Sequence, residues 1–540
     1  MELSKKRIFD LLKEQVRLNP CAGALETQGF VCSWKELDDI SDFLAVRMHN
    51  DCIVKGMHVG IWCCNSPKWV YTFLALIKLG AVPVLINTHY KPDELRAVLD
   101  YADVSVLYYG RGYREVLYGD VVSKIEKYLP KLKRYTDMNY NSKGKFLNCE
   151  DFSKSEKSAA AMEMLENIKK GVKCDDTACI IFTSGTTSVP KGVMLSHYNI
   201  VNNSAATVRH MEWCSSDKMC ITVPLFHCFG VTSGIVACMI SGASAYLLPH
   251  FSTEEVWKLV TEGGYTILNG VPSMFLAMVR KGEHYKDKAV SLKSGIIAGS
   301  SIIKRDYFEI MNRFPDMKLQ PSYGQTETSP CVSIADPDDC LSDKATSCGK
   351  VIEDVKVRIA DTQVMSCNGR FKEGEIQVKG YNVMKGYYKL ENETMHSFTE
   401  DGWLKTGDIG YFNEEGRLCV TGRIKDIIIR GGENISPGEI EELVRRFDCI
   451  KEAKVIGIPA GVVQEEPVMC LVVDKKSDLS DDTIKQYLSR KLADYKVPSH
   501  IIRFLRFPVK SNGKLDIVKL KSMVLNKLEL NNLKEDVNNV

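Results

Sequence analysis

Residues Ile180 to Gly192 read I-I-F-T-S-G-T-T-S-V-P-K-G. An apolar, strand-like run from Thr177 to Phe182 breaks there into hydroxyl side chains and a glycine, and closes on Pro190-Lys191-Gly192. Hydroxyls and backbone N–H groups at the end of a strand can wrap a polyphosphate, and a nearby ammonium can meet its charge. The stretch is not a Walker A loop, which requires G-x-x-x-x-G-K-[ST]. Taken alone, the run could also be a serine- and threonine-rich surface loop.

The composition is typical of a soluble globular protein. The chain has 540 residues, of which 44% are hydrophobic and 26% charged, enough for about two to four domains. The formal net charge of +2 gives no reason to expect nucleic acid as a partner. The 19 cysteines show no C-x-x-C spacing, so we expect reduced thiols in a cytoplasmic protein rather than a zinc site or a disulfide framework. No apolar signal core follows the first residues.

The segment from Cys228 to Pro249 carries no charge and is long enough to span a bilayer. It contains several glycines and hydroxyl side chains, however, and polar turns flank it. We therefore predict a buried helix from about Val231 to Ser241, a terminating Gly242 and a buried strand from Ala243 to Leu248. No transmembrane segment is expected.

The first half of the chain alternates helical and strand-like segments. The predicted helices are 34–49, which a capping box at Ser33 opens, 67–79 and 92–101; the predicted strands are 59–63, 82–86 and 104–109. This rhythm predicts parallel sheets with helices on their faces. Residues 139–173 are polar and weakly patterned, which predicts a surface excursion.

Two further strand ends carry glycine and polar residues. A helix from Ser196 to Met211 follows the Ile180 to Gly192 segment, and a strand from Leu292 to Ile297 ends in Ala298-Gly299-Ser300-Ser301. A later strand end reads Tyr323-Gly324-Gln325-Thr326-Glu327. Ligands of open α/β sheets bind outside the carboxyl ends of the strands, so we expect both ends to face one crevice.

From Val355 onward the sequence pattern changes to short β segments separated by glycine-containing turns. Beyond Thr421 to Asp426 the pattern predicts helices at 437–446 and 481–494 and strands at 454–458, 468–473 and 500–507. We predict an α/β fold with a large N-terminal domain, residues 1–421, of parallel-rich sheets, helices and a small β-barrel-like part. A small mobile α+β C-terminal domain, residues 422–540, follows it.

Six motifs resemble those of the adenylate-forming superfamily, which includes acyl-CoA synthetases, nonribosomal adenylation domains and luciferases. They stand in the family's order and are Thr183 to Gly192, Pro224-Leu225-Phe226-His227, Tyr323 to Glu327, Thr406-Gly407-Asp408, Gly422-Arg423-Ile424-Lys425-Asp426 and Asn512-Gly513-Lys514. The resemblance implies two half-reactions. A carboxylate attacks the α-phosphorus of ATP and gives an acyl-adenylate and diphosphate; a thiol then attacks the activated carbonyl, and AMP leaves.

The resemblance also implies residue roles. The nucleotide-binding set is Thr183, Ser184, Gly185, Thr186, Thr187 and Lys191 for the β- and γ-phosphates, Thr326 for the α-phosphate, Gly299, Ser300, Ser301, Tyr323, Gly324 and Gln325 around the adenine, and Asp408 with Arg423 at the ribose. Thr186 and Glu327 are the implied Mg²⁺ ligands. Lys514 would bridge the carboxylate and the α-phosphate, Lys425 would be the hinge of the small domain, and Gly431 and Gly432 would let coenzyme A pass. His227 could be either a core histidine or a gate on the acyl tunnel.

Structural roles compete with several of these assignments. Glu327 could cap a helix, Asp408 could close a turn, and Lys514 could be a solvated lysine. The six motifs in register favour the functional roles. The chain departs from the family at Ser188, where glycine is usual, and at Gln464-Glu465, where Gly-Glu is common.

The segments Pro224 to Gly230, Gly270 to Pro272 and Gly324 to Pro330 resemble those of medium- and long-chain fatty acid–CoA ligases. The residues expected to line the acyl pocket are apolar and uncharged, which favours an uncharged monocarboxylate; they are Phe229, Gly230, Val231, Val271 and Cys331. The implied partners are a carboxylic acid, ATP, Mg²⁺ and coenzyme A, with the chain a monomer or homodimer. The alternatives are an aryl-acid CoA ligase, transfer to a carrier-protein thiol, and a catalytically silent ligand-binding relative.

Overall fold

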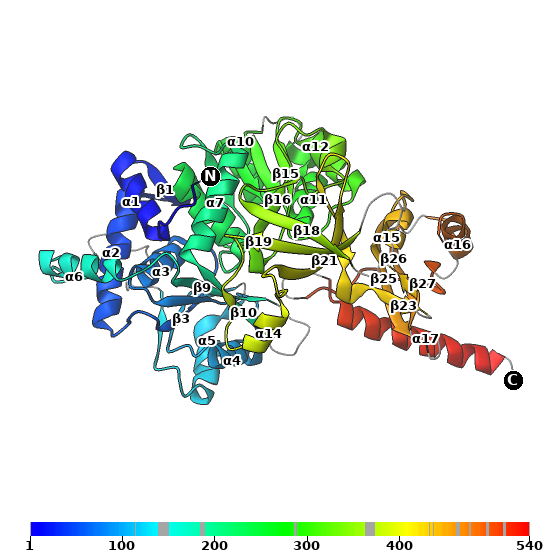
Figure 1. The fold of residues 1–540 in the computed structure, drawn as a ribbon, viewed down its shortest axis with the longest axis horizontal. Helices are drawn as coiled ribbons and strands as arrows, with labels where there is room; N and C mark the ends of the chain where they lie inside the picture. The colour runs from blue at the N-terminus through cyan, green and yellow to red at the C-terminus, as the bar shows by residue number, and fades with distance from the viewer. Residues whose placement is uncertain are drawn as a thin grey trace. The chain divides into compact units, whose positions relative to one another are not determined.

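The computed structural model of the chain describes residues 2–113, 115–138, 151–183, 190–285, 288, 290–361, 373–430, 433–435, 437–460, 465–474, 477–492, 496–510 and 515–538 (Figure 1). It divides into two compact units, the first comprising Met1–Val357 and Val378–Leu404, the second Arg358–Gln377 and Lys405–Val540. The division runs through strands of one sheet. The predicted boundary between residues 421 and 422, and the mobility expected of the domain beyond it, stay predictions.

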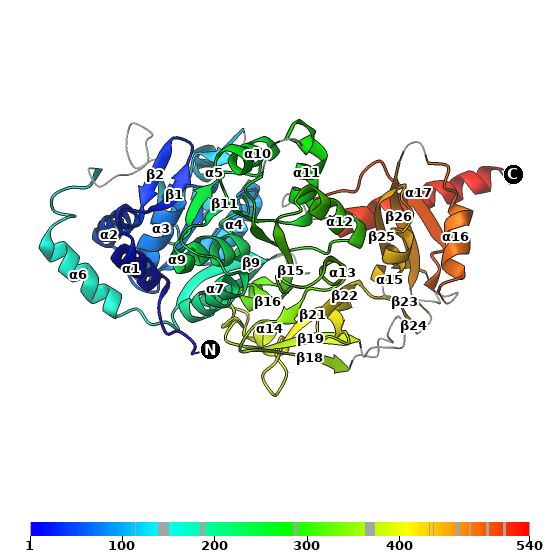
Figure 2. The same cartoon turned by 90° about the horizontal axis from the view of Figure 1, so that it is seen from above.

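Two parallel-rich sheets form the framework of the first unit (Figures 1 and 2). The nine-stranded sheet has the order β17-β16-β15-β14-β13-β11-β12-β1-β2, and the seven-stranded sheet has the order β20-β10-β9-β4-β3-β5-β8. The first sheet comprises β1 (Gly23–Thr27), β2 (Phe30–Ser33), β11 (Lys218–Ile221), β12 (Ser244–Leu247), β13 (Ile267–Asn269), β14 (Ser294–Ile297), β15 (Lys318–Gly324), β16 (Cys331–Ile334) and β17 (Lys350–Val351). The second comprises β3 (His58–Trp62), β4 (Val82–Leu85), β5 (Val106–Tyr109), β8 (Arg134–Asp137), β9 (Thr177–Thr183), β10 (Lys191–Ser196) and β20 (Gly386–Tyr387). The predicted α/β class with parallel-rich sheets is confirmed.

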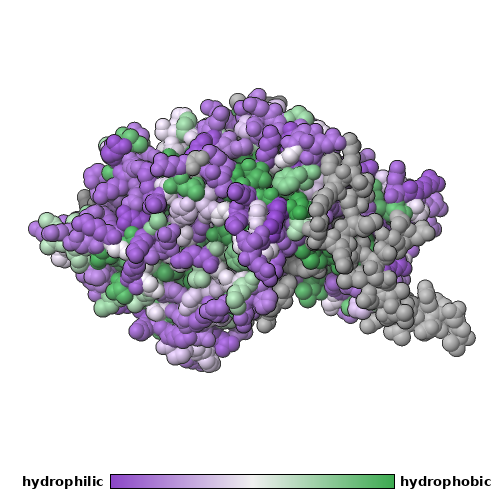
Figure 3. All heavy atoms as spheres, in the orientation of Figure 1, coloured by the Kyte–Doolittle hydropathy of each residue, from purple (hydrophilic) through white to green (hydrophobic). Residues whose placement is uncertain are grey.

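Helices separate and cover these sheets. They are α1 (Ile8–Leu18), α2 (Trp34–Asn50), α3 (Pro67–Lys78), α4 (Pro92–Tyr101), α5 (Tyr118–Ile125), α6 (Ala159–Lys170), α7 (His197–Met211), α8 (Cys228–Gly230), α9 (Ala237–Ser241), α10 (Thr253–Glu262), α11 (Pro272–Lys281), α12 (Lys304–Arg313), α13 (Leu341–Lys344) and α14 (Glu391–His396). Over the first unit, the face seen in Figure 3 is mostly hydrophilic.

Helix α3 lies between the two sheets. It contacts β3 and β4 of the seven-stranded sheet and β1 of the nine-stranded sheet. The Ser66 hydroxyl accepts a hydrogen bond from the Trp69 N–H, and Pro67 occupies the first turn, two features that favour a helix start. All its residues except Lys68 are buried, as expected of a helix that is apolar on every side.

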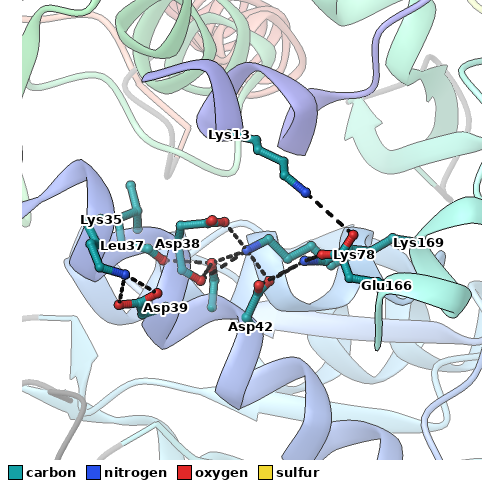
Figure 4. Close-up of polar contacts among 10 residues, drawn as sticks. Lys13, Lys35, Leu37, Asp38, Asp39, Asp42, Lys78, Glu166 and Lys169 are labelled. Carbon is teal, nitrogen blue, oxygen red and sulfur yellow. Dashed lines mark hydrogen bonds and ion pairs between the residues drawn. The ribbon is translucent and has the colours of Figure 1, made fainter. Parts of the chain in front are cut away.

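The last residue of α3 places a charge in this interior. Lys78 is 1% exposed, and its Nζ lies 2.7 Å from Oδ1 of Asp38 and 2.6 Å from Oδ1 of Asp42, both on α2 (Figure 4). Lys169 of α6 lies 2.7 Å from the same Asp42 oxygen. Burial alone would lower the pKa of Lys78, but the two carboxylates raise it above its ordinary value. The ammonium therefore stays charged and ties α2, α3 and α6 together.

Helix α6 corrects the prediction of a surface excursion over residues 139–173. Residues 139–150 lie outside the described residues, but Ala159–Lys170 is helical, and the Ser158 hydroxyl accepts a hydrogen bond from the Ala161 N–H at its start. Leu165 and Lys169 are its buried residues. Because one of these two is charged, the apolar periodicity that would have predicted the helix is weak.

The uncharged segment after Cys228 folds as predicted inside the first unit. A π-helical stretch, η3 (Val231–Val236), leads into α9, which ends at Gly242 with φ +80°. Strand β12 follows, with buried neighbours on both sides in the sheet. Among the residues that the structure describes, no helix combines the length and apolar character that a membrane span requires.

The second unit begins with most of a four-stranded sheet, where a β-barrel-like part was expected. Its order is β18-β19-β21-β22, with bounds β18 (Val355–Asp361), β19 (Gly374–Gly380), β21 (Leu404–Phe412) and β22 (Leu418–Arg423). The unit continues with β23 (Ile428–Arg430), β24 (Glu433–Ile435), α15 (Pro437–Val444), β25 (Ile450–Pro459), β26 (Glu465–Val473), α16 (Asp481–Ser489), β27 (His500–Arg503) and α17 (Ile517–Asn538).

The α+β character predicted for the C-terminal part is confirmed, with corrections. Alternate residues of β25 and β26 enter two cores: Val455 and Met469 pack with α15 and α16, whereas Ile456 and Val468 pack with α17. Helix α16 ends at Ser489 instead of Asp494. Helix α17 and the β23–β24 hairpin were not predicted.

Candidate functional site

Four neighbouring parallel strands bring several predicted residues of the first unit to one edge of the nine-stranded sheet. Strands β15, β14, β13 and β11 are consecutive and parallel. His227 follows β11, Val271 follows β13, and the Gly299 to Ser301 segment follows β14. Tyr323 and Gly324 end β15, and Gln325 to Glu327 come directly after it. The two glycine- and hydroxyl-rich strand ends therefore lie on adjacent strands; that they face one crevice stays a prediction. This edge is where open α/β sheets bind ligands.

The end of β15 turns sharply to present Thr326 and Glu327. A Cβ on Gly324 would collide with the carbonyl oxygen of Pro330, so only glycine fits there. The close approach lets the Gln325 N–H donate to that carbonyl at 3.1 Å. A single 3₁₀ turn, η5 (Thr326–Thr328), follows.

A contact between side chains joins the ends of β11 and β15. The Thr326 side chain is buried, and its hydroxyl oxygen accepts from the Cys228 thiol, with Sγ and Oγ1 3.6 Å apart. The same sulfur lies 3.8 Å from Nδ1 of His227. Both predicted residues, Thr326 and the partly buried His227, therefore flank one thiol at the sheet edge.

The residues expected around the adenine occupy neighbouring strand ends. Gly299 has φ +84°, in the left-handed region that favours glycine, and Ser300 and Ser301 are exposed. Tyr323 lies on the adjacent strand and is buried.

Two paired strands border the hydroxyl-rich segment 184–189 in the sequence. Strands β9 and β10 are antiparallel, with Thr183 opposite Lys191, and the Thr183 hydroxyl donates to the Lys191 carbonyl at 3.5 Å. The strand predicted before the loop is thus confirmed. The predicted residues Ser184, Gly185, Thr186 and Thr187, and the departure at Ser188, lie outside the described residues.

Tyr387, which the sequence did not predict, contacts both charged groups of the first unit's site. It lies on β20, where it pairs with Val193 of β10. The Lys191 Nζ lies 4.7 Å from the centroid of its ring, and its hydroxyl donates to Oε1 of Glu327 at 3.0 Å. Burial raises the pKa of Tyr387 and the Glu327 carboxylate raises it further, so the phenol stays protonated and donates.

The second unit holds Asp408 and Arg423 opposite each other on β21 and β22. The Arg423 Nε lies 2.8 Å from Oδ1 of Asp408, whose side chain is 5% exposed. Gly407, with φ +70°, turns the chain so that the Asp408 N–H donates to the Thr406 hydroxyl at 3.1 Å. An ionised carboxylate can accept about four hydrogen bonds, which suits this aspartate to paired ribose hydroxyls.

The remaining predicted residues follow in the second unit. Lys425 lies in η6 (Ile424–Asp426), directly after β22. Gly431, Gly432 and Lys514 lie outside the described residues, as does Gln464.

Glu327 suits a magnesium ion that arrives with a nucleotide. Across the described part of the chain, no group of three or more His, Cys, Asp or Glu side chains could hold a metal ion. In nucleotide sites, however, Mg²⁺ is usually held by one or two carboxylates and the substrate phosphates rather than by a protein cage. One carboxylate beside a lysine and a buried hydroxyl fits that requirement.

Comparison with known proteins identifies the family. The family model described as AMP-binding enzyme matches residues 12–388, and that of the AMP-binding enzyme C-terminal domain matches residues 439–514. The chain belongs to the AMP-binding enzyme family. The predicted membership of the adenylate-forming superfamily is thereby confirmed, and with it the prediction of an enzyme of the AMP-forming acid–thiol ligase class.

The relatives extend over most of the chain. The "Putative acyl-CoA synthetase YngI" of Bacillus subtilis (strain 168) is 33% identical over 492 residues, which cover 88% of this chain and 89% of that protein. The mitochondrial medium-chain acyl-CoA ligase ACSF2 of Macaca fascicularis is 29% identical over 496 residues, covering 88% and 80%. The crystal structure of ATP-bound MatB from Rhodopseudomonas palustris, 23% identical, superposes with a TM-score of 0.81 and covers 96% of this chain and 99% of that one. The last likeness confirms the fold.

Proposed function

We propose that this protein activates a medium- to long-chain aliphatic monocarboxylate with ATP and transfers the acyl group to coenzyme A. The observation that carries the proposal is the convergence of Lys191, Thr326 and Glu327 on one side of the first unit, within the range of the family match. The names of the relatives, an acyl-CoA synthetase and a medium-chain acyl-CoA ligase, support the thiol and the chain length. A cytoplasmic location and a monomeric or homodimeric state stay predictions.

In the first half-reaction the acid's carboxylate oxygen attacks the α-phosphorus, and diphosphate leaves. Negative charge from the acid and three phosphates must be gathered at one place, which requires fixed donors and cations. Lys191 meets the β- and γ-phosphates together with the hydroxyls of the segment Thr183 to Thr187. The Thr326 hydroxyl donates to the α-phosphate, and Glu327 holds the Mg²⁺, which neutralises phosphate charge when bound. Lys514 bridges the carboxylate and the α-phosphate.

The nucleotide stays bound through both half-reactions. Asp408 accepts from the ribose hydroxyls, with Arg423 fixing its carboxylate. The adenine is contacted by Tyr323 and by the Gly299 to Ser301 segment. In the second half-reaction the small domain turns about Lys425. The coenzyme A arm then passes close to Gly431 and Gly432, and its thiol displaces AMP.

Asp408→Ala should weaken AMP and ATP binding by about 10- to 100-fold, because a charged hydrogen-bond acceptor contributes about 1.5–3 kcal/mol. Equilibrium binding of both nucleotides measures the effect. The matched control is Glu415→Ala, which removes an exposed carboxylate 3.5 Å from Arg417 on the same hairpin and should leave both affinities unchanged. AMP binding as tight as in the parent would reduce Asp408 to a structural residue of the turn.

The acyl pocket favours an uncharged chain. The proposed lining residues, Phe229, Gly230, Val231, Val271 and Cys331, carry no charge, and Gly230, Val231 and Cys331 are buried. Val271 lies beside Gly299, because a Cβ built on Gly299 would be 3.2 Å from Cγ1 of Val271. An apolar wall next to the adenine segment is the expected setting for the chain of an aliphatic acid.

ATP–diphosphate exchange with a panel of acids tests this specificity. From acetate to decanoate the specificity constant should rise by about fourfold per methylene until the pocket is filled, since each buried methylene contributes ~0.8 kcal/mol. A flat profile, or preference for an amino acid, contradicts the proposal. Preference for benzoates indicates the aryl-acid alternative. If an acid supports exchange but coenzyme A does not take the acyl group from the resulting adenylate, the acceptor is a carrier-protein thiol. If the protein binds nucleotide but supports no exchange with any acid, it is a catalytically silent relative.

A further inference from the structure

We propose that Tyr387 is a positioning residue that fixes Lys191 and Glu327 for the triphosphate of ATP. The inference rests on the proposed function, which assigns the lysine to the β- and γ-phosphates and the glutamate to the Mg²⁺ they carry. The tyrosine meets the two groups with different parts of its side chain. Its ring face takes the ammonium, at 4.7 Å from the centroid, and its hydroxyl donates to the carboxylate at 3.0 Å.

The chemistry of the phenol suits this double contact. An ammonium is attracted to the electron-rich face of an aromatic ring, whereas a carboxylate needs a donor, which the hydroxyl at the ring edge supplies. Neither contact neutralises the charge of its partner. A lysine and a glutamate that paired directly would each lose part of their attraction for the nucleotide. The tyrosine therefore orients both groups and preserves their charges, as preorganisation before binding requires.

The backbone around Tyr387 makes the contact rigid. The Tyr388 N–H donates to the Gly192 carbonyl at 2.8 Å, directly beside Lys191. The Met384 N–H donates to the Glu327 carbonyl at 2.9 Å. Strand β20 is thus hydrogen-bonded on one side to the strand that carries the lysine, and the residues before it are hydrogen-bonded to the turn that carries the glutamate.

The next residue provides a matched control. Tyr388 directly follows Tyr387 in the chain, but its hydroxyl donates to Oδ2 of Asp103 at 2.6 Å. Burial and the Asp103 carboxylate raise the pKa of Tyr388, as burial and Glu327 do for Tyr387. The two tyrosines therefore make the same kind of bond, to carboxylates in different places, and only one of these carboxylates belongs to the proposed site.

Equilibrium binding of MgATP and of AMP to the full-length protein tests the proposal without any acid or coenzyme A. Tyr387→Phe keeps the ring and removes the donor, and it should raise the dissociation constant of MgATP about 10-fold, the lower end of the range for a hydrogen bond to a charged group. Tyr387→Leu also removes the ring and should weaken binding by a further factor of about two to five. AMP, which lacks the β- and γ-phosphates, should bind as in the parent.

Three comparisons make the outcome decisive. Tyr388→Phe should leave both affinities unchanged. In a Glu327→Gln background, Tyr387→Phe should add less than about a twofold effect, because the carboxylate it serves is gone. Equal weakening of MgATP and AMP, or MgATP binding by Tyr387→Phe as tight as in the parent, overturns the proposal. These binding measurements need no exchange activity. A parent protein that binds MgATP but fails the exchange assay would therefore contradict the proposed ligase activity, while the effect of Tyr387 on MgATP binding could still be interpreted.

Discussion

Lys514→Ala should lower the rate of acyl-adenylate formation by at least about 10²–10³-fold, the usual cost of removing one preorganised donor from a developing charge. Negative charge builds up at the α-phosphate as the carboxylate attacks, and the lysine ammonium is the group that the Asn512-Gly513-Lys514 motif assigns to that position. ATP–diphosphate exchange measures this half-reaction by itself.

The second half-reaction should behave differently. If the small domain presents Lys514 in the first step and Gly431-Gly432 in the second, Lys514→Ala should convert supplied acyl-adenylate and coenzyme A to acyl-CoA within a few-fold of the parent rate. Gly432→Trp should show the reverse, with adenylate accumulating. Lys510→Ala, which removes an exposed lysine from the same segment, should affect neither step. Equal loss of both half-reactions in Lys514→Ala, with an unchanged melting temperature, would contradict the alternating use of the two faces.

Lys78→Met should lower the free energy of unfolding of the first unit by about 3–5 kcal/mol, because it leaves the carboxylates of Asp38 and Asp42 facing a buried site without their shared cation. Lys169 remains 2.7 Å from Asp42, but Asp38 loses its 2.7 Å ion pair. The loss is a large part of the stability of an ordinary domain.

Tryptophan fluorescence during urea unfolding reports this effect selectively. All 6 tryptophans, at positions 34, 62, 69, 213, 257 and 403, belong to the first unit. The control is Lys35→Met on the outer side of α2, where Lys35 lies 2.9 Å from Asp39 and is 60% exposed (Figure 4); such surface pairs contribute little. Equal midpoints for Lys78→Met and Lys35→Met would mean that the buried network does not hold the helices together.

Short-range features of the sequence predicted much of the fold and of the candidate site. The strand before Thr183 and the strand end at Tyr323-Gly324 each depend on residues within a few positions of one another. Their residue types therefore carry the structural information directly. The association of Asp408 with Arg423 was implied by the resemblance, and the structure places the two residues opposite each other on one hairpin.

The features that were missed depend on contacts between distant segments. Glu327 is 60 residues from Tyr387, and Asp38 is 40 residues from Lys78. Lys78 ends an apolar helix, and the packing of α2 against α3 places it beside Asp38 and Asp42. Helix α6 was missed for the same reason. One of its two buried residues is Lys169, whose burial depends on the ion pair with Asp42 of the distant helix α2.

The acyl-adenylate route is tested most directly by the fate of the acid's oxygen. A single turnover with an aliphatic acid whose carboxylate carries two ¹⁸O atoms, ATP and coenzyme A is followed by mass analysis of the nucleotide and phosphate products. Carboxylate attack at the α-phosphorus, followed by thiol attack at the carbonyl, leaves one ¹⁸O in AMP and one in the thioester, and none in diphosphate. Label in inorganic phosphate with formation of ADP would contradict the account, because the acid would then have attacked the γ-phosphorus.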